Sequence, residues 1–206
     1  MKITFTRHGE SQANLLQEFS NRGLKHPLTP VGRQQAAALA QTLQGQNVTH
    51  VYSSPVLRAL ETAIILAGRL GVAYQVVEAL REYDVGILEG RSDPPAWQVW
   101  KELAEAWLSN QRLDECIEGG ESFYEVRQRF MPFIEQLIKE YGQSQAHLVC
   151  VGHGGLYRLM LPLVLLNVDE GVITQQGGFT YTVCITSKLT PAGLVCTTWN
   201  GAPIES

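Results

Sequence analysis

Short apolar runs alternate with longer amphipathic segments along most of this chain. Four runs have the length and the content of apolar and β-branched residues expected of buried strands, at residues 2–6, 48–53, 72–77 and 147–152. Between and after them, apolar residues recur at helical spacing in segments that start near residues 30, 55, 94, 122 and 155. Strands that are separated by helices pair in parallel, so the pattern predicts an α/β fold.

Local signals mark the ends of several predicted helices. Ser54, which stands before Pro55, is expected to cap the second helix, and Gly71 is expected to end it. Ser122 and Glu125 have the spacing of a capping box, which predicts the start of a long helix. These signals divide the chain into elements of ordinary length.

The last part of the chain has a different pattern. Two β runs, at residues 179–187 and 194–199, are joined by a turn that contains Pro191 and Gly193. We therefore expect a three-layer α/β/α sandwich with a mostly parallel mixed sheet and an antiparallel edge. Residues 1–206 are expected to form a single domain with a helical insertion at about 91–120. The terminal hairpin could offer a free edge, which leaves a homodimer open.

Composition excludes several classes of protein. Hydrophobic residues make up 45% of the chain and charged residues 17%, which is a globular composition. The formal net charge of −4 provides no general attraction for nucleic acid or anionic lipid. No apolar run has the length of a signal peptide or a membrane span, and the four cysteines form no CxxC pair. We expect a cytoplasmic protein with reduced thiols, no nucleic-acid partner and no membrane partner.

Unusual polar residues follow the predicted strands. Arg7 and His8 follow the first strand, Arg58 lies just after the second, Glu82 after the third and His153 after the fourth. Because parallel strands place their carboxyl ends at one edge of a sheet, these five side chains are predicted to share one cleft.

The chemistry of these side chains suits a phosphoryl group. Guanidinium groups bind phosphate oxygens through two hydrogen bonds, and imidazoles supply a nucleophile and a further donor. Nearby arginines disfavour protonation of His8, so that its ring nitrogen can attack phosphorus near neutral pH. The same arginines would repel a divalent cation, so we expect no metal in the site.

The order of these motifs resembles the histidine phosphatase superfamily, specifically its phosphoglycerate mutase-like branch. The similarity rests on Thr6-Arg7-His8-Gly9-Glu10-Ser11 with Asn14, Pro27-Leu28-Thr29-Pro30-Val31-Gly32-Arg33, Ser53-Ser54-Pro55-Val56-Leu57-Arg58-Ala59, Arg81-Glu82-Tyr83-Asp84-Val85-Gly86, Gly119-Gly120-Glu121-Ser122 and Val151-Gly152-His153-Gly154-Gly155. Together these motifs span nearly the whole chain in the order of the family.

The resemblance implies roles for individual residues. His8 would become phosphorylated, and Glu82 would protonate the leaving oxygen and then activate water. Arg7, Arg58 and His153 would bind the phosphoryl oxygens. The family pattern extends this binding site to Asn14, Ser20 and Gly154, and it requires no cofactor.

The sequence says little about the rest of the substrate, which is expected to be a small phosphorylated molecule. Arg22, Lys25, Tyr83 and Arg91 are candidates for binding a second anionic group. Trp97, Trp100 and Trp107 recur at helical spacing, which is more often a packing stripe than a substrate platform.

Three functions compete. A phosphomonoesterase is favoured over a cofactor-dependent phosphoglycerate mutase, because such mutases usually have a longer insertion and an Arg-His-Tyr-Gly run where this chain has Tyr83-Asp84-Val85-Gly86. A catalytically idle module that binds phosphorylated ligands is the third alternative. It predicts a lesion among the five core residues, and the sequence has none.

Overall fold

The structure, a computed structural model, describes residues 1–109 and 111–204. Seven strands form one sheet in the order β3-β2-β4-β1-β5-β6-β7. The strands are β1 (Lys2–Arg7), β2 (Val48–Ser53), β3 (Ala73–Val76), β4 (His147–Gly152), β5 (Ile185–Thr190), β6 (Gly193–Trp199) and β7 (Ala202–Pro203). β1 to β4 pair in parallel, whereas β5 to β7 are antiparallel.

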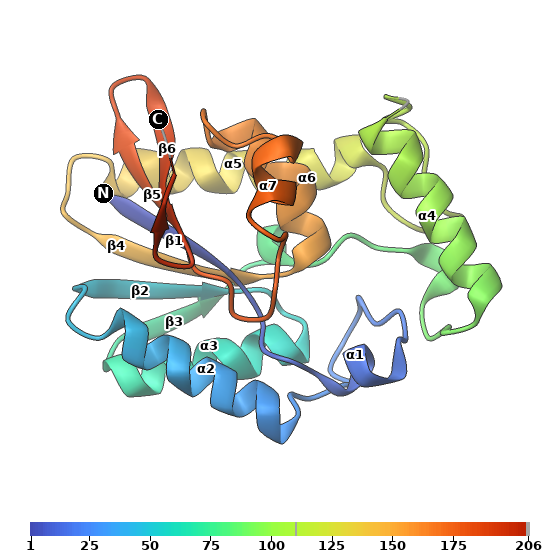
Figure 1. Cartoon of the computed structure of the whole chain (residues 1–206), viewed down its shortest axis with the longest axis horizontal. Coiled ribbons are helices and arrows are strands. Elements are labelled where there is room, and N and C mark those ends of the chain that lie inside the picture. Colours follow the sequence, from blue (N-terminus) through green and yellow to red (C-terminus); the bar gives the residue numbers. More distant parts are fainter. Residues whose placement is uncertain (110, 205–206) are drawn as a thin grey trace.

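Helices cover both faces of the sheet (Figure 1). On one face lie α2 (Pro30–Leu43) and α3 (Leu57–Leu70), and on the other lie α5 (Phe123–Tyr141) and α6 (Gly154–Val164). Successive side chains of β4 alternate between the two layers: Val149 and Val151 pack with α2 and α3, whereas Leu148 and Cys150 belong to the opposite core. The predicted three-layer α/β/α sandwich with its antiparallel edge is confirmed.

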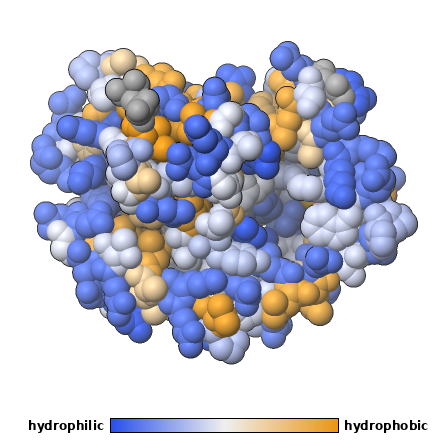
Figure 2. Space-filling view, in the orientation of Figure 1, coloured by the Kyte–Doolittle hydropathy of each residue, from blue (hydrophilic) through white to orange (hydrophobic). Residues whose placement is uncertain are grey.

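Two helices lie beyond the carboxyl ends of the parallel strands. α1 (Gln12–Leu16) follows β1, and α4 (Pro94–Leu108) stands at the side of the molecule (Figure 1). The surface is hollowed between α4 and the rest of the protein (Figure 2). None of the helices in the described ranges combines the length and the apolar character needed to cross a bilayer.

Two predicted helix starts have different outcomes. Ser122 caps α5 and forms the expected capping box with Glu125. The expected cap at Ser54 is wrong, because α3 begins at Leu57 and has Val56 at its N-cap position. The hydroxyl of Ser54 lies instead 2.7 Å from Nε2 of His153.

The predicted strand at 179–187 is also wrong over its first six residues, since β5 begins only at Ile185. The preceding segment turns sharply: Gly177 and Gly178 have positive φ values, and so does Thr182, with φ 52°. Its backbone bonds to Arg7, whose side chain donates to the Phe179 carbonyl and whose own carbonyl accepts from the Thr182 amide. A tertiary contact with the end of β1 therefore replaces strand pairing there.

Short elements had no sequence signal. α1 has five residues and α7 (Glu170–Gln175) has six, which is too short for a helical repeat to show. β7 pairs with β6 through two residues, so it covers part of the outer edge of the terminal hairpin. The homodimer stays a prediction.

Candidate active site

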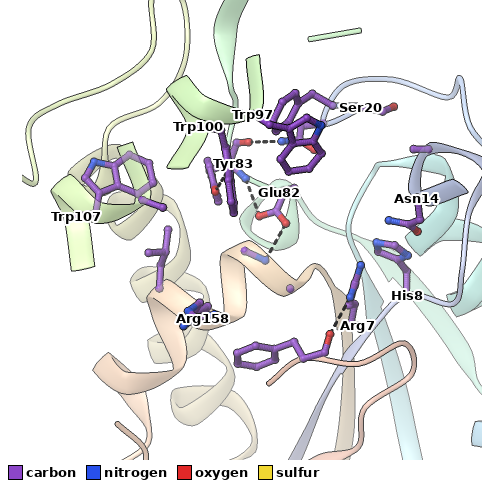
Figure 3. Close-up of a pocket in the computed structure, with 18 of the residues that line it drawn as sticks. Arg7, His8, Asn14, Ser20, Glu82, Tyr83, Trp97, Trp100, Trp107 and Arg158 are labelled. Carbon is purple, nitrogen blue, oxygen red and sulfur yellow. Dashed lines mark hydrogen bonds between the residues drawn. The ribbon is translucent and has the colours of Figure 1, made fainter. Parts of the chain in front are cut away.

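A cavity of about 560 Å³ opens where the parallel strands end. Arg7, His8, Arg58 and Glu82 line it, and they come from three separate parts of the chain. Figure 3 shows Arg7, His8 and Glu82 around this cavity. His153 lies fully buried beside them, with its ring centroid 5.1 Å from that of His8. The structure thus brings together the five side chains that the sequence predicted to meet.

The ring of His8 is fixed by hydrogen bonds on both nitrogens. Nδ1 lies 2.7 Å from the carbonyl oxygen of Gly9, and Nε of Arg58 donates to Nε2 at 2.9 Å. A carbonyl can only accept, so the proton of the neutral ring is assigned to Nδ1 and the lone pair to Nε2. Burial lowers the pKa of His8 well below its usual value, and Arg58 and Arg7 lower it further. His8 is therefore uncharged at neutral pH, with the lone pair on Nε2.

The two arginines are held by backbone oxygens. Arg58 is 5% exposed and donates through Nη1 to the carbonyl of Ser20. Its burial lowers its pKa to about 10, which still leaves the group charged at neutral pH. Arg7 donates through Nη1 to the Phe179 carbonyl at 2.8 Å, and its guanidinium carbon lies 4.4 Å from the ring centroid of Tyr181. Both cations are thus positioned before any anion binds.

His153 is oriented by Ser54. The Ser54 hydroxyl oxygen accepts from the amide of Val56, so its own hydrogen is available for Nε2 of His153. This arrangement favours the proton on Nδ1 of His153, which is buried and has no hydrogen-bond partner. Nε of Arg7 is likewise buried and unpaired. Arg7, next to His8 in sequence, and His153, whose ring contacts that of His8, thus each have an unpaired buried donor, and such a donor is costly unless an acceptor reaches it.

The carboxylate of Glu82 lies against the amino terminus of α6. Its carboxylate accepts from the amides of Gly155 at 3.0 Å, Leu156 at 2.6 Å and Tyr83 at 3.1 Å. Burial raises its pKa, although Arg58 and the three amides act in the opposite direction. A carboxyl group with a raised pKa can hold a proton at a pH where exposed carboxyls have lost theirs.

Neighbouring carboxylates are engaged elsewhere. Asp84 pairs with Arg22, Glu78 pairs with Arg81, and Glu89 accepts from the amide of Asn21. Glu82 lines the cavity, whereas Glu78, Asp84 and Glu89 are not among its lining residues. The structure therefore supports the choice of Glu82 that the sequence motif made.

Comparison with known proteins agrees with this geometry. The model of the histidine phosphatase superfamily (branch 1) matches residues 3–200. The chain belongs to this superfamily.

Several known proteins are similar to this chain over most of its length. A metal-independent phosphoserine phosphatase of Arabidopsis thaliana is 33% identical over 76% of this chain and 66% of its own length. Phosphoglycerate mutase-like protein 4 of the same plant is 31% identical over 76% of this chain and 68% of its own. A crystal structure of a phosphoserine phosphatase mutant from Entamoeba histolytica, in complex with phosphoserine, is 27% identical with a TM-score of 0.74 and covers 97% of this chain and 96% of that one.

The additional binding residues predicted from the family pattern, Asn14, Ser20 and Gly154, lie on the cavity wall. Tyr83, a candidate for binding a second anionic group, also lines it. The amide oxygen of Asn14 accepts from the backbone and hydroxyl of Ser11, which leaves its NH₂ group as the donor for the cavity.

The prediction that Arg22, Lys25 and Arg91 bind a second anionic group is wrong. Arg22 donates two hydrogen bonds to Asp84, at 2.8 and 2.7 Å, and is not among the residues that line the cavity. Lys25 pairs with Glu18, and Arg91 pairs with Asp93. These ion pairs join residues that are distant in sequence or lie in loops, so no local pattern predicted them.

Sequence reasoning missed several residues of the site. Asn21 donates to the Tyr83 carbonyl at 2.8 Å, and its side-chain oxygen lies 3.5 Å from Nη2 of Arg58. Phe179 lines the cavity within a segment that had been interpreted as a strand. The adjacent Gly177 and Gly178 were the available signal for a turn there.

Proposed function

We propose that this protein hydrolyses phosphomonoesters through a phosphohistidine formed at Nε2 of His8. The observation that carries the proposal is the pair of unpaired buried donors, Nε of Arg7 and Nδ1 of His153, beside a neutral His8. A phosphoryl group bound there would satisfy both donors and would be in reach of the nucleophile. Arg58 adds a permanent positive charge next to the same ring nitrogen.

In the first step Nε2 of His8 attacks phosphorus, and the bond from phosphorus to the ester oxygen breaks. Glu82 gives its proton to that oxygen, so the alcohol leaves uncharged. Arg58 exchanges its bond to His8 for a bond to a phosphoryl oxygen. Arg7, Arg58 and His153 offset the charge that spreads over the three equatorial oxygens, and Asn14 provides a further donor.

In the second step Glu82, now a carboxylate, removes a proton from water. The oxygen of that water forms a bond to phosphorus, and the bond from phosphorus to Nε2 breaks. Inorganic phosphate and neutral His8 result, with the proton back on Glu82. The group that served as the acid in the first step thus serves as the base in the second.

The test compares His8→Ala with the intact protein on a panel of phosphomonoesters that includes phosphoserine. Removing the nucleophile should lower kcat/KM by about three orders of magnitude or more, because parts of a covalent mechanism act as a unit. Rapid quenching with a ³²P-labelled ester should trap a protein-bound phosphate that is labile to acid and stable to alkali. His50→Ala, a histidine outside the cavity lining, is the matched control and should retain activity.

Other outcomes would contradict the proposal. Equal turnover by His8→Ala would remove His8 from the mechanism, and no phosphate release from any ester would favour the idle binding module. Conversion of 3-phosphoglycerate to 2-phosphoglycerate faster than phosphate release would favour a mutase. We also propose that the enzyme works in the cytoplasm on small phosphorylated molecules, which agrees with four free cysteines.

A further inference from the structure

The cavity extends well beyond the phosphoryl site, and its wall there is rich in aromatic side chains. The apolar part of this wall includes Phe19, Trp97, Trp100, Trp107, Leu108, Leu159 and Phe179. We call this part the aromatic chamber. Trp97 and Trp100 line the same cavity as Glu82, which is the group that would protonate the leaving oxygen, and Trp100 donates to the hydroxyl of the adjacent Tyr83 (Figure 3). The part of the substrate attached to that oxygen must therefore enter the aromatic chamber.

The indole rings are held before any ligand enters. Nε1 of Trp97 donates to the carbonyl of Gln17 at 3.0 Å, and Nε1 of Trp100 donates to the hydroxyl of Tyr83 at 2.6 Å. The Trp97 and Trp100 rings meet edge to face with their centroids 5.5 Å apart, and the ring centroid of Phe19 lies 4.3 Å from that of Trp97. Because the polar edges are already bonded, the rings offer apolar surface rather than hydrogen bonds to a ligand.

The charges around the chamber do not suit a second anion. Besides Arg7 and Arg58, the cation on the described cavity wall is Arg158, which is paired with Glu170. Two carboxylates also lie on the wall: Glu105, and Glu18, whose charge is offset by Lys25. A carboxylate or a second phosphate in the substrate would thus lose water without gaining a free cation.

We infer that the preferred substrates are monophosphates whose alcohol part is uncharged and carries an aromatic or similarly flat apolar group. This inference rests on the proposed phosphatase function and names its substrate class. It assigns Trp97 and Trp100 to recognition of the leaving alcohol. It also predicts poor turnover of phosphoglycerates, because they bring a carboxylate into the chamber.

The first experiment compares esters whose leaving alcohols are all alkyl alcohols, so that the aromatic ring does not make the leaving group better. The set is 2-phenylethyl phosphate, n-propyl phosphate, phosphoserine and 3-phosphoglycerate, each tested for dependence on His8. Burial of the phenyl ring should raise kcat/KM for 2-phenylethyl phosphate at least about ten-fold above that for n-propyl phosphate. The two charged esters should be hydrolysed more slowly than n-propyl phosphate.

The second experiment removes one ring. Trp97→Leu should lower kcat/KM for 2-phenylethyl phosphate by about five-fold and leave n-propyl phosphate within about two-fold, since the lost contact is to the ring alone. Trp97→Phe keeps an aromatic face and should restore most of the preference. Val99→Ala is the matched control, because Val99 lies on the same helix, is 43% exposed and is not a lining residue.

A binding measurement keeps the inference testable even without turnover. The affinity of 2-phenylethylphosphonate, followed by tryptophan fluorescence or calorimetry, should exceed that of propylphosphonate by at least about ten-fold. Equal affinities, or faster His8-dependent hydrolysis of 3-phosphoglycerate than of 2-phenylethyl phosphate, would overturn the substrate class and leave the phosphatase intact. Turnover that does not depend on His8 would overturn the phosphatase mechanism. The phosphonate affinities would then still show whether the aromatic chamber binds a phenyl group.

Discussion

The side chain of Glu82 has an environment that suits two successive roles. Burial raises its pKa, which favours the acid form, while three backbone amides bind its oxygens and stabilise the carboxylate. The acid form and the carboxylate form are thus each favoured by a different feature of the surroundings. Contact with the amino terminus of α6 holds the carboxylate on the cavity wall.

Glu82→Gln should affect esters according to their leaving groups. Without the acid, kcat/KM for alkyl phosphates should fall by about 100-fold or more, whereas para-nitrophenyl phosphate, which needs little proton donation, should lose about ten-fold or less. Steady-state kinetics on both esters provides the measurement. Equal losses would assign proton donation to another group.

The same substitution should change the pH profile. The acid form of Glu82 disappears as the pH rises through its raised pKa, so kcat/KM for alkyl phosphates should decline on the alkaline side. In Glu82→Gln that decline should vanish from the profile. Its persistence would mean that a different group titrates.

At the scale of elements, the residue at the amino terminus of α6 determines how closely the Glu82 carboxylate can approach that helix. A Cβ atom at position 155 would lie 2.9 Å from both carboxylate oxygens of Glu82 and 2.6 Å from Cε1 of Tyr83. Glycine is therefore required at this position by close approach of side chains rather than by its own backbone angle. Because Gly155 has no side chain, the amides of Gly155 and Leu156 can bond to the carboxylate of Glu82.

Gly155→Ala should push Glu82 out of place. A displacement of about 1 Å in a catalytic group commonly costs about 100-fold in rate, and overpacking costs about 1–3 kcal/mol of stability. Turnover of alkyl phosphates and urea unfolding measure the two effects.

Gly68→Ala is the matched control for this change. A Cβ atom at Gly68, within α3, would meet no atom within 4 Å. There alanine should raise the free energy of unfolding by about 0.5–1 kcal/mol, because glycine has the greater freedom in the unfolded chain.

Full activity in Gly155→Ala would show that Glu82 does not need its present position.

At the scale of the whole molecule, buried histidines make folding less favourable at acid pH. His8, His147 and His153 are almost completely buried, and burial lowers the pKa of each. In the unfolded chain these rings would take up protons near pH 6.5. As the pH falls through about 6.5, the unfolded state therefore binds more protons than the folded state, so stability falls as the pH falls until the folded rings also take up protons.

Urea unfolding at pH 7.5, 6.5 and 5.5 should show this loss. Each histidine contributes up to about 1.4 kcal/mol per pH unit within the window, and proton uptake by Glu82 in the folded state opposes part of it. His153→Gln should show a shallower decline, because one of the titrating rings is gone. A free energy of unfolding that does not change across this range would contradict the argument.

Much of the fold and the core of the site could be predicted from the sequence. The period of apolar residues determined the strands and helices, and parallel pairing placed Arg7, His8, Arg58, Glu82 and His153 at one edge of the sheet. Each of these residues stands within a few positions of a strand end, so the order of elements was enough to bring them together.

Tertiary structure decided what local patterns do not encode. Arg22 was a free cation by its sequence, but Asp84, which lies far along the chain, holds it outside the cavity. Residues 179–184 had a β pattern, but bonds to Arg7 hold this segment out of the sheet and place Phe179 on the cavity wall. The spacing of Trp97 and Trp100 indicated a helix face, whereas only the position of α4 beyond the strand ends put that face over Glu82. Periodicity reports which side of an element is apolar, and long-range contacts determine what that side meets.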